Sequence, residues 1–113
     1  MTVFEAIADT TRRDMLDRLR LDGPLSLNEL AEPLDMTRQG ATRHIDALVE
    51  SGLVRVRWEG RRRLHELDPV PLAGIRDWLA PYEAEWDRRL ERLRRHLETE
   101  DERGESALRQ EER

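Results

Sequence analysis

Residues 26–63 read SLNELAEPLDMTRQGATRHIDALVESGLVRVRWEGRRR, and this stretch decides the fold. Its first half has the pattern of two short helices. Ser26 and Glu29 have the spacing of a capping box, which predicts that a helix starts here. Thr37 is placed to cap a second helix, and Gly52 stands where a left-handed stop is expected at its end. The sequence therefore predicts two helices joined by a short turn.

The second half of the same stretch changes to a period of two, which is typical of a strand. Apolar side chains alternate with arginines from Val54 to Trp58. Glu59-Gly60 has the composition of a two-residue hairpin turn, and the return strand is expected over residues 61–67. Two helices joined by a short turn and followed by a hairpin with a basic tip form a winged helix-turn-helix.

Helices are also expected on both sides of this stretch. Val3, Phe4 and Ile7 recur at helical spacing, and Asp9 is placed to cap the next helix. Another helix follows the hairpin. The sequence therefore predicts a mainly α fold with one small β-hairpin, in the order α-α-α-α-β-β-α.

The helix predicted after the hairpin is long and amphipathic. Its apolar positions follow a near-heptad spacing, at Leu72, Ile75, Leu79, Tyr82, Trp86, Leu90, Leu93 and Leu97. Pro81 is expected to kink or interrupt this helix. Apolar residues are almost absent after Glu98. We therefore expect residues 1–98 to form one domain and residues 99–113 to form a disordered acidic tail.

The composition limits what the chain can be. Its 113 residues suffice for one domain, and 37% of them are hydrophobic, so a thin core completed by a second copy is expected. The absence of cysteine excludes disulfides, thiolate metal sites and a cysteine nucleophile. No stretch approaches the roughly 20 apolar residues of a membrane span. We expect a soluble, cytoplasmic protein without membrane contact.

The charge is unevenly distributed, although the net charge is only −5. Residues 36–63 hold seven arginines against three acids, whereas residues 68–113 hold nine arginines against thirteen acids. A local basic surface attracts nucleic-acid phosphates whatever the total charge of the chain. Nucleic-acid contact is therefore expected in the middle of the chain.

In five short stretches the chain resembles the ArsR/SmtB family of bacterial repressors. They are, in order, residues 8–13 (ADTTRR), 27–31 (LNELA), 43–45 (RHI), 48–54 (LVESGLV) and 59–61 (EGR). A later stretch, residues 77–82 (DWLAPY), resembles a metal-independent branch of that family. The resemblance implies a homodimer that binds operator DNA and usually represses its own operon.

The start of the second helix of the motif carries the candidate residues for reading DNA. Gln39 and Arg43 lie on one outward line, and such side chains pair with adenine and guanine in the major groove. Gly40 leaves room for close approach, and the amides beside Thr37 can hold a phosphate. The expected contacts on this helix are Thr37, Arg38, Gln39, Gly40, Thr42, Arg43 and His44. An ordinary polar helix face is the alternative.

The hairpin tip carries three consecutive arginines, Arg61, Arg62 and Arg63. Arginines on a protruding turn fit the backbone or the minor groove of DNA. Because side chains alternate along a strand, the three cannot all face one way. The alternative is a solvated run of charge, in which Arg62 or Arg63 pairs with Glu59 or Glu66.

The sequence shows no spacing of residues that is typical of a metal site or of an enzyme active site. The three histidines, His44, His65 and His96, lie at no chelating spacing. On the last helix, Asp77 and His96 lack the partners of a shared site, so we expect no metal and no cofactor. His65 stands where the family usually has Tyr or Phe and is expected to pack beneath the wing. No spacing sets a nucleophile beside a base, so an enzyme is not expected.

A dimer interface is expected on the first and last helices. Its candidate residues are Val3, Phe4, Ile7, Leu79, Tyr82, Trp86, Leu90 and Leu93. The aromatic row Trp78, Tyr82 and Trp86 could instead line a pocket for an unidentified apolar effector. The sequence thus predicts a dimeric transcriptional repressor whose residues 1–98 bind an inverted-repeat operator. The alternative is a winged-helix module that binds protein and not DNA.

Overall fold

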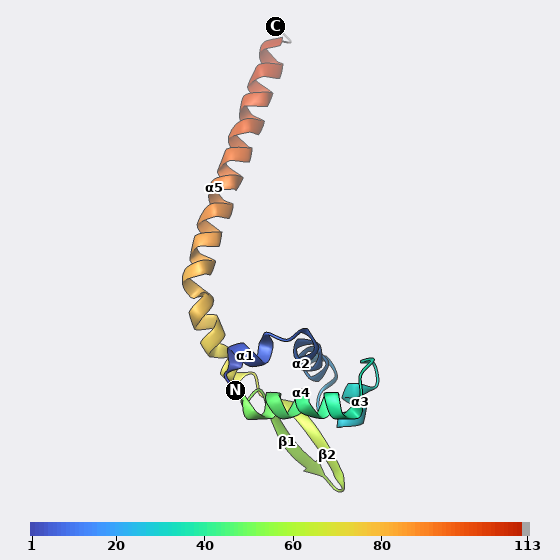
Figure 1. Ribbon diagram of the computed structural model, residues 1–113. Coiled ribbons are helices and arrows are strands. Elements are labelled where there is room, and N and C mark those ends of the chain that lie inside the picture. The colour runs from blue at the N-terminus through green and yellow to red at the C-terminus, as the bar shows by residue number, and fades with distance from the viewer. Residues whose placement is uncertain (112–113) are drawn as a thin grey trace. The chain divides into compact units, whose positions relative to one another are not determined.

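The computed structural model describes the backbone of residues 1–111 and the side chains of residues 1–104. Its elements are α1 (Val3–Ile7), α2 (Thr10–Asp22), α3 (Leu27–Ala31), α4 (Arg38–Glu50), β1 (Val54–Glu59), β2 (Arg62–Leu67), the 3-10 helix η1 (Val70–Leu72) and α5 (Ala73–Glu111) (Figure 1). This order confirms the predicted winged helix-turn-helix. The chain divides into two compact units, Met1–Arg76 and a second that begins at Asp77, whereas the sequence placed a boundary after residue 98. No helix in the described part of the chain has the length and hydropathy needed to cross a membrane.

Four helices begin at a side-chain cap. Thr2, Asp9, Ser26 and Thr37 each accept a hydrogen bond from the amide three residues later, at 3.1, 3.0, 3.3 and 3.0 Å. At α3 the cap is reciprocal, because Ser26 N donates to Glu29 Oε1 at 3.2 Å. The caps predicted at Asp9, Ser26 and Thr37 are confirmed.

Two arginines of α2 close the C-terminal end of α1. Arg12 donates from Nε to Ala6 O at 2.7 Å and from Nη2 to Glu5 O at 2.9 Å. Arg13 donates from Nη1 to Ile7 O at 2.6 Å. The last carbonyls of a helix lack partners within it, so these guanidinium groups satisfy them and fix α1 to α2. Sequence reasoning assigned no role to either arginine.

An aliphatic core lies between α1, α2, α3, α4 and the base of the hairpin. It is formed by Ala6, Met15, Leu16, Leu19, Leu25, Leu30, Ala41, Ile45, Leu48, Leu53 and Val54. Met15, Leu16 and Leu19 form the inner face of α2, and Ala41, Ile45 and Leu48 form that of α4. Gly52 has a φ of 84°, the left-handed conformation that ends α4 and turns Leu53 into the core.

The hairpin differs from its prediction by one residue. β1 and β2 pair in antiparallel fashion from Val54 opposite Leu67 to Glu59 opposite Arg62. The two-residue loop is therefore Gly60 and Arg61, so the predicted turn at Glu59-Gly60 and the predicted strand start at Arg61 are wrong. Gly60 has a φ of 63° and Arg61 has no positive φ, as expected when glycine takes the first position of a type II′ turn.

His65 fixes the base of the hairpin to the segment before α3. Its backbone pairs with Leu25 through two hydrogen bonds, at 2.8 and 3.1 Å, and its Nδ1 lies 3.1 Å from Leu25 O. The side chain is only 2% exposed, which confirms that it packs beneath the wing. Burial lowers the pKa of His65 because it disfavours the charged imidazolium, and the positive charge of Arg63 lowers it further. The contact with Leu25 O acts in the opposite direction and raises it.

Replacement of His65 is expected to change how stability depends on pH. The unfolded imidazole has a pKa near 6.5, so between the lower folded value and about 6.5 the unfolded chain binds more protons. Stability therefore falls as the pH falls through this window, by at most about 1.4 kcal/mol per pH unit. His65→Phe should flatten the slope measured by urea unfolding. Equal slopes for wild type and His65→Phe would contradict the assignment.

α5 is longer than the sequence predicted. It passes Pro81 without interruption and continues to Glu111, so the prediction of disorder from Thr99 is wrong for residues 99–111. Residues 112–113 of that segment lie outside the described residues. Pairs one turn apart support the helix up to the start of this segment: Arg94 lies 3.9 Å from Glu98, and His96 lies 3.1 Å from Glu100.

Candidate nucleic-acid interface

The first turns of α4 present polar side chains on the face opposite the core. Thr37, Arg38, Gln39 and Arg43 are exposed, whereas Ala41, Ile45 and Leu48 on the other face are buried. Thr42 is half-buried and donates from Oγ1 to Arg38 O at 2.9 Å. The predicted reading face is therefore open to solvent along its length.

Gly40 has a second role beyond leaving space for a ligand. A Cβ at this position would lie 3.2 Å from Thr37 Oγ1, the oxygen that accepts the Gly40 amide hydrogen bond at 3.0 Å. A side chain here would therefore press on the cap of α4. Because glycine has no side chain, it leaves the Thr37 cap undisturbed and also leaves the space through which the sequence predicted that DNA approaches the helix.

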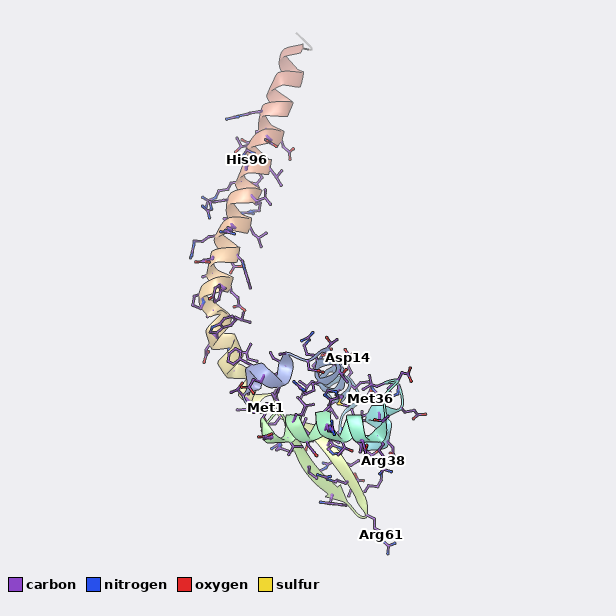
Figure 2. All side chains as sticks on the ribbon, viewed as in Figure 1. Met1, Asp14, Met36, Arg38, Arg61 and His96 are labelled. Atoms are coloured by element: carbon purple, nitrogen blue, oxygen red, sulfur yellow. The ribbon has the colours of Figure 1, made fainter. Side chains whose placement is uncertain are left out.

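The hairpin projects from the α1–α4 unit with Arg61 at its tip (Figure 2). A groove of about 350 Å³ separates the hairpin from the starts of α3 and α4. Arg38, Arg61 and Arg63 line it together with Asn28 and Thr42. The helix start and the wing, which the sequence predicted as two separate contact regions, therefore form the two sides of one basic groove.

Arginines on this surface are left without acidic partners. Among the described residues, Arg38, Arg43, Arg61 and Arg63 form no ion pair, whereas Arg18, Arg55, Arg57 and Arg62 of the same unit each pair with an acid. Arg18, for example, pairs with Asp22 at 3.1 Å. An unpaired guanidinium group keeps its hydrogen-bond donors free for phosphate or a base edge.

Arg62 differs from its two neighbours. It forms an ion pair with Glu29, the acid of the α3 capping box. The partners expected from the sequence, Glu59 and Glu66, are wrong; Glu59 instead lies 3.8 Å from Arg57. Hydrogen bonds from the Ser26 amide and hydroxyl, and then the charge of Arg62, lower the pKa of Glu29. Arg62 thus connects the wing to α3, and its free neighbours face the groove.

His44 is directed to the start of α2. Its Nδ1 lies 3.8 Å from Asp9 Oδ1 and 3.5 Å from Arg12 Nη1, and the side chain is 22% exposed. The hydrogen bond from the Arg12 amide lowers the pKa of Asp9, and the charges of His44 and of the Arg12 side chain lower it further. Burial acts in the opposite direction and raises it. The sequence predicted His44 as a DNA contact, whereas its position beside Asp9 and Arg12 supports a structural role.

The residues predicted for a dimer interface lie in both units. In α1, Val3 and Ile7 pack partly against the core, and Phe4 is 46% exposed. In the second unit Leu79 is half-buried, and Tyr82, Trp86, Leu90 and Leu93 are 44, 51, 63 and 52% exposed. Such a row of large exposed apolar side chains on one helix face needs a covering surface.

The described residues contain no group of three or more histidines, cysteines or acids that could hold a metal ion. Of the two residues weighed for such a site on the last helix, His96 pairs with Glu100 at 3.1 Å. Metal independence stays a prediction.

Comparisons with known proteins agree with this geometry. Residues 7–57 match a family described as a helix-turn-helix domain. An HTH-type transcriptional regulator of Mycobacterium tuberculosis is 41% identical over 73 residues, which cover 65% of this chain and 67% of the relative. The crystal structure of an ArsR family transcriptional regulator is 38% identical, with a TM-score of 0.64 over 74% of this chain and 86% of that one.

A second solved structure is a homodimeric winged helix-turn-helix DNA-binding domain from Mycobacterium bovis. It is 26% identical, with a TM-score of 0.57 over 74% of this chain and 76% of that one. The shared sequence and the shared wing and helix arrangement lead to one conclusion. The chain belongs to the ArsR family of winged helix-turn-helix transcriptional regulators, which bind DNA and are not enzymes.

Proposed function

We propose that this chain is a homodimeric repressor that binds an inverted-repeat operator and blocks a promoter. The observation that supports it most is the groove between α4 and the wing, with Arg38, Arg61 and Arg63 on its walls and no acid paired with them. Family membership disfavours the alternative of a module that binds only protein. In the cytoplasm, the unpaired arginines of this groove would bind the phosphates of DNA.

The two sides of the groove have different roles in this proposal. α4 enters the major groove, where Gln39 and Arg43 contact base edges. The wing follows the sugar–phosphate backbone, where Arg61 and Arg63 contact phosphates. One DNA strand then passes through the groove between them. Arg62 positions the wing through Glu29.

A dimer is required because one α4 reads only one half-site. Two copies related by a two-fold axis read an inverted repeat with half-sites about 34 Å apart. The exposed apolar row of α5 supports this assembly. We assign the aromatic side chains of that row to the dimer and not to an apolar effector, because they continue the same stripe as the leucines.

Footprinting on the DNA upstream of the chain's own gene tests the proposal. The expected result is two protected segments on one face of the DNA, one helical turn apart and related by inverted symmetry. Protection that overlaps the promoter would support repression. Uniform or absent protection at low salt would contradict sequence-specific binding.

Binding to the operator is expected to be independent of metals. The chain has no cysteine, and its histidines lack the partners of a chelating site. Addition of Zn²⁺, Ni²⁺ or arsenite should leave the operator affinity unchanged in a fluorescence anisotropy titration. A stoichiometric metal that weakens binding about tenfold, by roughly 1.4 kcal/mol, would overturn this prediction.

A further inference from the structure

The apolar side chains of β1 form a stripe that extends past the core. Side chains alternate along a strand, so Val54, Val56 and Trp58 lie on one face of the wing. Val54 belongs to the core and is 2% exposed, whereas Trp58 is 64% exposed. Among the described residues, the indole of Trp58 takes part in no hydrogen bond, ring contact or cation–π contact. The stripe thus ends in a large aromatic group that its own unit leaves uncovered.

Trp58 lies on the face of the wing that borders the basic groove. The register of the hairpin places Trp58 opposite Arg63 and Val56 opposite His65. Side chains of directly opposed residues lie on the same face of a sheet. Arg63 and His65 both line the groove between the wing and α4, so Trp58 continues that face toward the hairpin tip.

The opposite face of the wing has its charges paired within the chain. Its three arginines, Arg55, Arg57 and Arg62, each form an ion pair with an acid. This face of the two strands carries no aromatic side chain. One face is therefore neutralised by acids of the same unit, whereas the groove face presents the unpaired guanidinium group of Arg63 beside the uncovered indole of Trp58.

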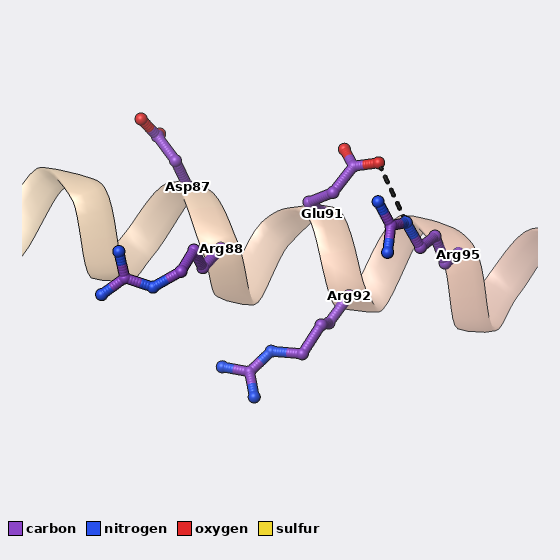
Figure 3. A pocket seen from close by; sticks show the side chains of 5 residues that line it. All are labelled: Asp87, Arg88, Glu91, Arg92 and Arg95. Carbon is purple, nitrogen blue, oxygen red and sulfur yellow. Dashed lines mark ion pairs between the residues drawn. The ribbon is translucent and has the colours of Figure 1, made fainter.

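An arginine-lined hollow on α5 lacks these features. It has a volume of about 640 Å³ and is lined by Asp87, Arg88, Glu91, Arg92 and Arg95. Its acids lie among its arginines, and Glu91 Oε1 is 3.3 Å from Arg95 Nε (Figure 3). Carboxylates repel phosphates, and no aromatic side chain lines the hollow. Of these two surfaces, the wing face is therefore the one suited to a nucleic-acid backbone.

We propose that Trp58 contacts DNA, with its indole packed on the deoxyribose of the strand whose phosphates Arg63 binds. The inference rests on the proposed function and adds to it a residue that makes an apolar contact. A strand that approaches Arg63 passes over the neighbouring indole, since opposed Cβ atoms lie about 5 Å apart. The sugars present C–H groups to the indole ring, and Nε1–H is free to donate to a phosphate oxygen.

The contact of Trp58 differs from those of the wing arginines in its dependence on salt. An arginine on a phosphate releases counterions from DNA, so its contribution weakens as the salt concentration rises. An indole on deoxyribose gains from the burial of apolar surface, which does not depend on charge. Because the sugar is the same in every nucleotide, Trp58 strengthens binding without selecting a sequence.

Replacement of Trp58 should lower DNA affinity without changing its salt dependence. Trp58→Ala removes one apolar contact from each copy of the dimer and should raise the Kd for operator and for scrambled DNA about tenfold. The slope of log affinity against log salt should keep its wild-type value, whereas Arg63→Ala should make it shallower by about two units. Trp58→Phe keeps an apolar ring and should recover most of the affinity. Leu21→Ala, at a side chain of α2 that is 70% exposed, is the control and should bind as wild type does.

Tryptophan fluorescence tests the contact itself. Bound operator should shield Trp58 from acrylamide, so the quenching constant of the wild-type protein should fall when DNA is added. Trp58→Phe retains only Trp78 and Trp86, both on α5, and its quenching constant should not change with DNA. Circular dichroism checks that each variant keeps the wild-type fold.

The outcomes separate this inference from the proposed function. If wild type and Trp58→Ala bind with equal affinity, or DNA leaves the quenching of the wild-type protein unchanged, the inference is overturned and the DNA-binding repressor stands. A shallower salt slope in Trp58→Ala would mean that Trp58 acts by positioning Arg63, which also overturns the direct contact. A wild-type protein that binds no DNA at low salt overturns both.

Discussion

Leu90→Asp is expected to convert the protein to a folded monomer that no longer binds its operator. Leu90 is 63% exposed in the single chain and lies in the middle of the apolar row. Burial of one leucine stabilises by about 1.5–3 kcal/mol, and a two-fold dimer buries it twice. A charge in its place should therefore raise the dimer dissociation constant by roughly 10² to 10⁴.

Because Leu90 belongs to the second unit, the core of Met1–Arg76 should be unaffected by this change. Sedimentation velocity and circular dichroism distinguish loss of the dimer from loss of the fold. Leu21→Asp is the matched control, since Leu21 is 70% exposed on α2 and outside the predicted interface. A Leu90→Asp protein that remains dimeric with wild-type operator affinity would place the interface elsewhere.

Arg43→Ala and Arg61→Ala are expected to weaken DNA binding in two different ways. Arg43 lies on the reading face of α4, so its loss should cost about 1–3 kcal/mol on the operator and relax the preference at one position in each half-site. Arg61 lies at the wing tip (Figure 2), so its loss should weaken binding to all sequences alike. The dependence of log affinity on log salt should become shallower by about two units, one for each copy.

The measurement is affinity for operator and for scrambled DNA across a salt series. Arg20→Ala is the control, because Arg20 is exposed and forms no ion pair among the described residues but lies on α2, away from the groove. Equal weakening of both DNAs by Arg43→Ala would make Arg43 a phosphate contact and pass base reading to Gln39 or Arg38. Loss of operator binding alone in Arg61→Ala would mean that the wing reads sequence or groove width.

Local signals in the sequence predicted the helices well. The caps at Asp9, Ser26 and Thr37 involve an amide only three residues away, so they can be recognised from adjacent residues. The stop at Gly52 is equally local. The hairpin turn was misplaced by one residue because glycine can occupy either loop position, and strand register is set by packing as well as by the loop.

Contacts between distant residues were not predictable in the same way. Arg62 and Glu29 are 33 residues apart, and nothing in the sequence favours Glu29 over the nearer Glu59 or Glu66. The difference between the paired Arg62 and its unpaired neighbours Arg61 and Arg63 follows from that one contact. The helix over residues 99–111 was missed because composition suggested disorder, but a low apolar content does not prevent a helix whose polar side chains pair one turn apart, as His96 and Glu100 do at the start of this segment.

The central claim is that the groove between α4 and the wing binds DNA as part of a dimer. Titration of the wild-type protein with DNA from upstream of its own gene, across a range of salt concentrations, tests it most directly. With Arg38, Arg61 and Arg63 on phosphates in each copy, log affinity should fall linearly with log salt with a slope of about −5. A slope near zero, or no binding at low salt, would contradict the claim.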